Sequence, residues 1–170
     1  MQCRNRVPIL GWVLIVTFGF LIVVTAQASS PLAGTWRLDV AKSKYSPGPA
    51  PKSGTYRYEV TRDGLKAVLD GVNAQGQKTH TEYSCGFDGK DCAYHTTVDG
   101  KPSTDPNATA AIYWKRTDDH TFEYAGKSKG RITGIGHVVI SKDGRVQTRT
   151  VTGTDAQGRK VDNTVILEKQ

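Results

Sequence analysis

Two cysteines in the middle of the chain, Cys85 and Cys92, are the first residues whose spacing suggests chemistry. If residues 86–91 form the loop of a hairpin, the two side chains lie directly opposite each other, and opposed positions bring Cβ atoms within about 4.5–5.5 Å. That distance suits a disulfide, which we predict. The alternative is a pair of reduced thiols buried as small apolar side chains. The spacing is not C-x-x-C, so a redox role is not favoured.

The same hairpin register gathers three possible metal ligands. It sets Tyr83 opposite Tyr94 and Glu82 opposite His95, and it places His80 on the same face as Glu82 and His95. Two imidazoles and a carboxylate can bind zinc. The alternative is the solvated polar face of an outer strand. We therefore predict no metal site and keep these three residues only as a candidate.

Aromatic residues are spread over the middle strands and could line a ligand site. A tyrosine supplies apolar surface together with one hydroxyl group. The alternative is that many of these side chains simply pack the core. The predicted ligand-binding residues are Tyr58, Tyr83, Tyr94, Tyr113, Trp114, Tyr124 and Arg149.

Arg149 is included because of its predicted position on a strand. It shares strand parity with Val151 and, through a hairpin at Asp143-Gly144, faces Val138. An arginine buried among apolar residues needs an anionic partner, and a bound fatty-acid-like anion could be that partner. The alternative is an outward-facing arginine on a threonine-rich strand.

No catalytic pattern is present in the sequence. The chain has no G-x-S-x-G or S-x-x-K motif, and several of its acidic residues stand in turns. We therefore expect a binding protein that is not an enzyme and needs no cofactor. The net charge of +7 is spread along the chain, without a basic run interleaved with aromatics, so nucleic acid is not an expected partner.

The first 28 residues have the three parts of a secretory signal peptide. Arg4 and Arg6 form a basic start, an uncharged apolar stretch follows, and Ala26-Gln27-Ala28 is an A-x-A cleavage site. We predict cleavage after Ala28 and export to the periplasm or the medium, with membrane contact only through this segment. The alternative is an uncleaved anchor, because the apolar stretch approaches the ~20 residues that span a bilayer. Removing 28 of 170 residues leaves one predicted domain, 29–170, of 142 residues, and lowers the net charge from +7 to +5.

The rest of the chain has the pattern of an all-β domain. Turn signals recur at short intervals, and no helical period lasts longer than two turns. Residues 41–45 could form one helical turn, and the proline-rich residues 46–51 form an extended connector. The expected strands are 34–39, 55–61, 65–72, 78–85, 92–98, 110–116, 121–126, 131–140, 146–153 and 160–168.

One hairpin can be predicted in detail. Asp63-Gly64 is a strong hairpin signal because both residues tolerate positive φ. If these two residues form the loop, Tyr58 lies opposite Leu69 and Val60 lies opposite Ala67. All four side chains then share one face, as a half-buried hairpin requires.

A meander of ten strands has two unpaired edges unless it closes on itself, and closure leaves room for one small ligand. We therefore predict an antiparallel up-and-down β-barrel of about 8–10 strands, with the last strand beside the first. Gly34-Thr35-Trp36 opens the first strand. Gly34 lets the chain pass close beneath the strands, and the indole of Trp36 then caps one end of the core.

This opening resembles that of the calycins, which comprise the lipocalins and the fatty-acid-binding proteins. The stretches that are similar to secreted lipocalin-like bacterial proteins are Gly34-Thr35-Trp36-Arg37-Leu38-Asp39, Lys42-Ser43-Lys44-Tyr45, Ser141-Lys142-Asp143-Gly144 and Asp155-Ala156-Gln157-Gly158. The resemblance covers most of residues 32–169 and implies a barrel that binds a small, largely apolar molecule. It also implies a basic residue packed over Trp36, for which Lys169 and Lys160 are the candidates.

Two functions follow from these observations. The first is an exported protein that holds a hydrophobic or amphipathic ligand inside a β-barrel. The alternative is a periplasmic protein-binding or inhibitor module with a filled core and no ligand. A void of ~300 Å³ or more lined by aromatics would favour the first, and a solid core with an exposed apolar patch would favour the second. The sequence sets no oligomeric state.

Overall fold

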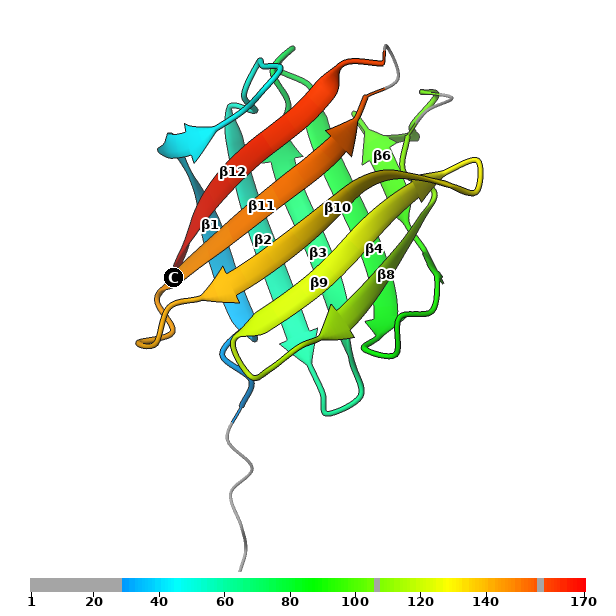
Figure 1. Cartoon of the computed structure of the whole chain (residues 1–170). Coiled ribbons are helices and arrows are strands. Elements are labelled where there is room, and N and C mark those ends of the chain that lie inside the picture. The colour runs from blue at the N-terminus through cyan, green and yellow to red at the C-terminus, as the bar shows by residue number, and fades with distance from the viewer. Residues whose placement is uncertain (1–28, 106–107, 156–157) are drawn as a thin grey trace, which may run out of the picture.

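The computed structural model describes residues 29–105, 108–155 and 158–170, so the predicted signal segment, residues 1–28, lies outside the described residues. The described chain is all-β, as expected, and none of it belongs to a helix that could cross a lipid bilayer. Its twelve strands (Figure 1) are β1 (Gly34–Lys44), β2 (Ser53–Val60), β3 (Gly64–Val72), β4 (Lys78–Gly86), β5 (Cys92–Ala93), β6 (His95–Val98), β7 (Lys101–Pro102), β8 (Ala111–Arg116), β9 (Thr121–Ser128), β10 (Arg131–Ile140), β11 (Val146–Thr154) and β12 (Lys160–Lys169).

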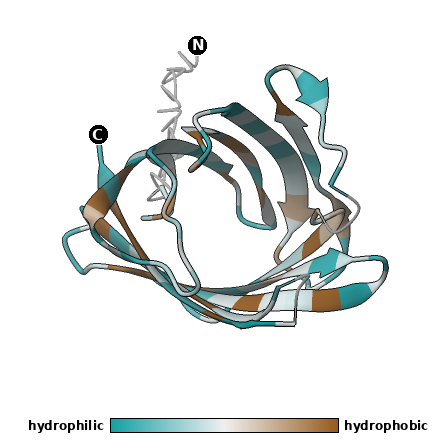
Figure 2. Cartoon of the chain, turned by 90° about the horizontal axis from the view of Figure 1, so that it is seen from above, coloured by the Kyte–Doolittle hydropathy of each residue, from teal (hydrophilic) through white to brown (hydrophobic). Residues whose placement is uncertain are grey.

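The strands form one antiparallel sheet that curls into a half-barrel around an interior (Figure 2). The order across the sheet is β5-β8-β9-β10-β11-β12-β1-β2-β3-β4-β6-β7, so most neighbours in sequence are also neighbours in space. The expected pairing of the last strand with the first is confirmed, with Leu38 opposite Leu167. Because side chains alternate along each strand, every second residue faces the interior.

The two ends of the sheet order meet at residues 92–98, which the sequence predicts as one strand. The first part, β5, pairs with β8, and the second part, β6, pairs with β4. Between them the Tyr94 amide donates to the carbonyl of Ala110. This division, together with the short β7, explains why there are twelve strands where ten were expected.

The predicted disulfide is present at this junction. Cys85 on β4 and Cys92 on β5 are bonded, with their Cα atoms 5.5 Å apart. The expected register is also confirmed, because Glu82 lies opposite His95. The bond therefore links β4 to the strand that pairs with β8, and it holds the two ends of the sheet order together.

The β2–β3 hairpin turns one residue earlier than the sequence suggested. Tyr58 lies opposite Ala67 and Val60 lies opposite Leu65, so the predicted pairs were wrong by two residues, although the shared face is unchanged. The Thr61 amide donates to the Gly64 carbonyl, and the Thr61 hydroxyl accepts from the Gly64 amide. Gly64 is therefore a strand residue, and a Cβ there would overlap the backbone carbonyl of Cys85.

The helical turn expected at residues 41–45 is also wrong, because β1 continues to Lys44 through an irregularity after Asp39. The carboxylate of Asp39 accepts from the Lys42 amide at 3.0 Å. The Ser43 hydroxyl donates to the Asp39 carbonyl and accepts from the Ile166 amide on β12. These side-chain bonds satisfy the backbone locally and keep the segment on the sheet.

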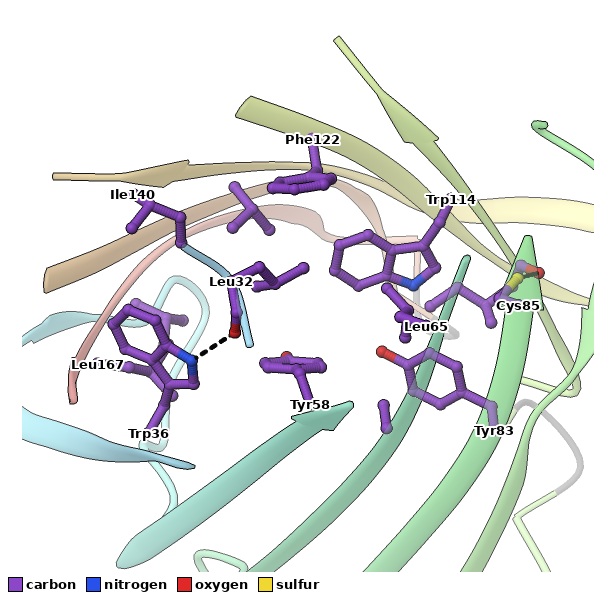
Figure 3. Packing of buried hydrophobic residues seen from close by; sticks show 14 of the residues in the cluster. Leu32, Trp36, Tyr58, Leu65, Tyr83, Cys85, Trp114, Phe122, Ile140 and Leu167 are labelled. Carbon is purple, nitrogen blue, oxygen red and sulfur yellow. Dashed lines mark hydrogen bonds between the residues drawn. The ribbon is translucent and has the colours of Figure 1, made fainter. Parts of the chain in front are cut away.

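One end of the half-barrel, here called the closed half, is filled by Leu32, Trp36, Phe122, Ile140 and Leu167, all buried (Figure 3). The Trp36 indole has no exposed surface, and its Nε1 donates to the Leu32 carbonyl at 2.9 Å. This packing agrees with the expectation that Trp36 caps one end of the core.

A basic residue lies over that indole, in the arrangement expected from the resemblance. The ammonium of Lys169 stands 5.0 Å from the Trp36 ring centroid and donates to the Pro31 carbonyl at 3.0 Å. Gly34 lies next to Lys169 and has a φ of +117°, a conformation that favours glycine. A side chain at Gly34 would also press on Lys169, since a Cβ there would stand 3.0 Å from the lysine Cε.

Candidate functional site

Above the closed half, β11 carries an arginine that points into the interior. Arg149 lies opposite Val138 on β10, as the Asp143-Gly144 hairpin predicts, and opposite Val165 on β12. Only 6% of Arg149 is exposed, so the outward-facing alternative is wrong. Its Nη1 donates to the hydroxyl of Tyr58 at 3.0 Å.

Aromatic rings surround the Arg149 guanidinium. Its central carbon lies 4.6 Å from the Tyr124 ring centroid, 5.3 Å from that of Tyr56 and 5.9 Å from that of Trp114. Such contacts stabilise a cation through the negative faces of the rings, and they do so more strongly where water is excluded. We call Tyr56, Tyr58, Tyr83, Tyr94, Trp114, Tyr124 and Arg149 the Arg149 cluster.

The guanidinium of Arg149 has no carboxylate partner among the described residues, and its Nε finds no acceptor there. Burial by itself would lower the pKa of Arg149, but the tyrosine hydroxyls around it hold that pKa above its ordinary value. The side chain therefore keeps its positive charge. A buried charge without a counter-ion is costly, so this arrangement calls for an explanation.

Four rings of the Arg149 cluster form a column in which each plane is close to parallel with the next. The centroids of Tyr94 and Tyr83 are 5.3 Å apart, those of Tyr83 and Trp114 are 6.5 Å apart, and those of Trp114 and Tyr124 are 5.1 Å apart. The interplanar angles are 26°, 22° and 20° in the same order. These spacings lie within the range of favourable offset stacking.

The position of Tyr124 depends on a glycine on the next strand. Gly136 lies opposite Tyr124, and a Cβ at Gly136 would overlap the tyrosine ring. The ring therefore lies flat across the backbone of β10 and reaches both Trp114 and Arg149.

Four hydroxyl groups of the Arg149 cluster, those of Tyr56, Tyr58, Tyr83 and Tyr94, are neutral hydrogen-bonding groups near pH 7. Burial raises the pKa of Tyr94 to about 12 and raises the pKa of Tyr56, Tyr58 and Tyr83 as well. The site therefore presents one fixed positive charge, neutral hydroxyls and ring faces.

A pocket of about 280 Å³ opens beside the Arg149 cluster at the end of the half-barrel opposite Trp36, which we call the open half. Tyr56, Tyr94, Leu38 and Leu69 supply its inner wall, and Asp70 lies in its polar lining together with threonine and serine residues. Since Tyr56 and Tyr94 are only partly buried, the pocket gives access to residues that surround Arg149. Its volume lies just below the ~300 Å³ at which small-molecule sites begin.

The structure brings together six of the seven residues that the sequence singled out for ligand binding: Tyr58, Tyr83, Tyr94, Trp114, Tyr124 and Arg149. Tyr113 lies apart from them. Its hydroxyl donates to the Glu123 carboxylate at 3.2 Å, and the ammonium of Lys127 stands 5.8 Å from its ring centroid. Because Trp114 points inward, alternation sends its neighbour Tyr113 to the outer face.

Two interior residues were missing from the predicted site. Tyr56 lies on the same face of β2 as Tyr58, because residues two apart on a strand share a face. This alternation could have identified Tyr56 from the sequence. Gln147 lies two residues before Arg149 on the same face of β11 and is fully buried. Neither polar atom of its amide has a partner among the described residues.

The candidate zinc ligands His80, Glu82 and His95 lie on β4 and β6, and His80 is already engaged. Its Nδ1 is 2.7 Å from Asp70 and its Nε2 is 3.1 Å from Glu82. The described part of the chain holds no group of three histidine, cysteine, aspartate or glutamate side chains that is placed to bind a metal ion. A hollow of about 600 Å³ lined by Asp70 and His80 lies nearby. Arg149 lines neither this hollow nor the pocket of about 280 Å³, but Tyr56 and Tyr94 of the Arg149 cluster line the smaller pocket.

No family model matches the chain, and no curated protein matches it.

Proposed function

We propose that this is an exported binding protein that holds a small amphipathic anion in the open half of its half-barrel, with the negative group of the ligand at Arg149. One observation carries the proposal: a buried guanidinium surrounded by aromatic rings, without a carboxylate partner among the described residues. A bound anion would supply the missing acceptor, and charge-assisted hydrogen bonds to arginine are among the strongest in proteins.

The pocket next to the Arg149 cluster supports a ligand rather than a purely structural role. The pocket of about 280 Å³ is lined by Tyr56, whose ring lies 5.3 Å from the guanidinium carbon. A structural arginine gains most from a fixed carboxylate neighbour, because an uncompensated buried charge destabilises the fold. The Nε of Arg149 has no acceptor among the described residues, so the negative group of a ligand could accept its hydrogen bond.

We also propose that the half-barrel is of the calycin type. The support is the arrangement at the closed half, where Gly34 with positive φ, the buried Trp36 and Lys169 over its ring lie together. These contacts agree with the features that the resemblance implied. Fold alone does not determine function, so the binding proposal depends on Arg149 instead.

A second function, docking of another protein, is favoured by one feature of the outer surface. Three apolar side chains of β10 are exposed: Ile132, Ile135 and Val139. If the interior holds no ligand, this strand is the place to look for a protein contact.

Export is part of the proposal and has its own test. The disulfide between Cys85 and Cys92 agrees with an oxidising compartment. We expect the N-terminal sequence of the exported protein to begin at Ser29. An intact Met1 in membrane fractions would show that the segment is retained as an anchor.

The binding proposal is tested by native mass spectrometry of protein recovered from the periplasm of its own cells. We expect a small bound anion in the wild type and its loss in Arg149→Met, which keeps an unbranched side chain but removes the charge. Arg131→Met is the matched control, because Arg131 is an exposed arginine of β10 that does not line the pocket. A wild type without any bound small molecule, or equal retention by both variants, would contradict the proposal.

A further inference from the structure

We infer that the ligand is a compact aromatic acid, with one carboxylate on a flat ring system, rather than a long-chain aliphatic acid. The inference rests on the proposed function, and it narrows that function to a chemical class. Three properties of the interior carry it: the size of the pocket, the column of rings and the direction from which a carboxylate can approach Arg149.

The first property is the limited space in the interior. The pocket beside the Arg149 cluster measures about 280 Å³. Below the cluster the interior is solid, because Leu32, Trp36 and Leu167 are fully buried (Figure 3). A long alkyl chain with its carboxylate at Arg149 therefore cannot extend into the closed half, whereas a molecule of one or two rings fits beside the cluster.

The second property is the column of rings. Tyr94, Tyr83, Trp114 and Tyr124 stack with successive interplanar angles of 26°, 22° and 20°. Tyr94 ends the column and also lines the pocket. A flat aromatic guest gains stacking energy on such a wall in addition to the burial of apolar area, and an alkyl chain gains only the burial.

The third property is the set of unpaired donors. Tyr124 and Tyr56 lie against the guanidinium at 4.6 and 5.3 Å, so an anion is left with its edge, where Nε has no acceptor among the described residues. The indole Nε1 of Trp114 is also buried without a partner there. A carboxylate has two acceptor oxygens that suit an arginine edge, and it lies in the plane of an aromatic ring to which it is attached.

The charge balance limits the ligand to a single negative charge. The Arg149 cluster contains one cation, Arg149, and burial raises the pKa of Tyr56, Tyr58, Tyr83 and Tyr94, so these hydroxyls are neutral. A second negative charge would be buried without a partner, which is strongly unfavourable.

The test is calorimetric titration of the purified protein with three probes of similar size: 2-naphthoate, decanoate and 2-naphthamide. We expect 2-naphthoate to bind about tenfold more tightly than decanoate, from stacking, and at least tenfold more tightly than the neutral amide, from the charge. Decanoate binding as tightly as 2-naphthoate would overturn the inference and leave the proposed function standing. Equal binding of the acid and the amide would contradict the proposed function itself, and failure of all three to bind would overturn the aromatic assignment.

Two variants separate stacking from charge. Tyr94→Leu keeps apolar bulk but removes the ring, so we expect about tenfold weaker binding of 2-naphthoate and a change of less than about twofold for decanoate. Tyr113→Leu on the outer face is the matched control and should bind both acids like the wild type. If Tyr94→Leu does not fold, the near-ultraviolet circular dichroism of the wild type gives the second measurement. A change in the tyrosine and tryptophan bands on adding 2-naphthoate but not decanoate is expected, and identical spectra with the two acids would contradict the inference.

Discussion

The two halves of the interior are built from the same strands but satisfy their side chains in opposite ways. In the closed half, the indole Nε1 of Trp36 has its acceptor at Leu32, and Lys169 lies over the ring. In the open half, the guanidinium Nε of Arg149 and the indole Nε1 of Trp114 are buried without partners among the described residues. The closed half also holds an unpaired amide, that of Gln147 opposite Ile140 and Leu167, but the buried charge without an anionic partner among the described residues lies in the open half, which therefore has the properties of a site.

This difference shows how one sheet can separate stability from binding. A satisfied, close-packed region stabilises the fold, and changes there should be seen mainly in unfolding experiments. A region with buried, unpaired donors destabilises the protein slightly and is retained where it serves a function. Substitutions in the two halves should therefore have different effects, and the largest loss of stability is expected in the closed half.

The largest effect is expected for Trp36→Ala in the closed half. Removing a fully buried indole should lower the free energy of unfolding by about 3–5 kcal/mol, because it leaves a cavity and an unsatisfied Leu32 carbonyl. Urea denaturation gives the value. A loss below ~1 kcal/mol would show that the closed half is not the main core. The free energy of unfolding of Trp114→Phe is the comparison, because this change keeps most of the aromatic ring in the open half.

The next effect concerns the link between the two ends of the sheet order. Replacing both Cys85 and Cys92 by alanine should lower the free energy of unfolding by about 2–3 kcal/mol, the chain-entropy value for so short a loop. The domain should remain folded, because the closed half has its own core. The Glu82–His95 pairing should also persist, and loss of the stacked Tyr83–Tyr94 signal in near-ultraviolet circular dichroism would show that the disulfide, not the sheet, holds this register.

The facing of side chains along a strand was easier to predict from the sequence than the position of a turn. Strand parity follows from alternation along a single strand, so the facing of Val138 and Arg149 and the pairing of Glu82 with His95 could be predicted and are confirmed. The turn near Gly64 was misplaced because that glycine is required by the neighbouring carbonyl of Cys85, a contact between distant residues.

The residues of the candidate site were only partly predictable, because strand alternation indicates which side chains face the interior but not which partners they find there. Alternation alone separates Tyr113 from Trp114, yet both were grouped together because residue type was weighed without strand parity. That Arg149 lacks a carboxylate could not be predicted, since it depends on what every strand around the interior presents to it. The same holds for the unpaired amide of Gln147.

A smaller effect is expected from the two buried polar residues on β11. Gln147→Leu removes an amide without partners among the described residues and should raise the free energy of unfolding by about 1–2 kcal/mol. Arg149→Met should raise it by about 1 kcal/mol, because it removes a buried charge. Anion binding should survive in Gln147→Leu and disappear in Arg149→Met. Destabilisation by both changes would mean that the interior polar groups of β11 are satisfied, both at Arg149 in the open half and at Gln147 opposite Ile140 and Leu167.

The smallest effect is expected at Asp70 and His80, which pair on the outer face where Asp70 also lines the pocket of the open half. The hydrogen bond with Asp70 raises the pKa of His80 above its ordinary value of 6.5, and the same bond lowers the pKa of Asp70 below 3.8. The contribution of His80 to stability is complete below about pH 6.5 and is lost as the pH rises through its raised pKa. The contribution of Asp70 is present above about pH 3.8 and is lost as the pH falls through its lowered pKa.

The pair therefore stabilises the fold most between about pH 4 and 6.5. Both side chains are more than a third exposed, so we expect no more than about 0.5 kcal/mol. Urea denaturation at pH 5.5 and 8.0 should show this loss in the wild type and not in His80→Gln, and identical pH dependence of the two proteins would contradict it. Anion affinity should stay constant over the same range, because Arg149 remains charged and burial raises the pKa of Tyr94 to about 12. A fall in anion affinity that disappears in His80→Gln would instead show that the outer face and the open half act together.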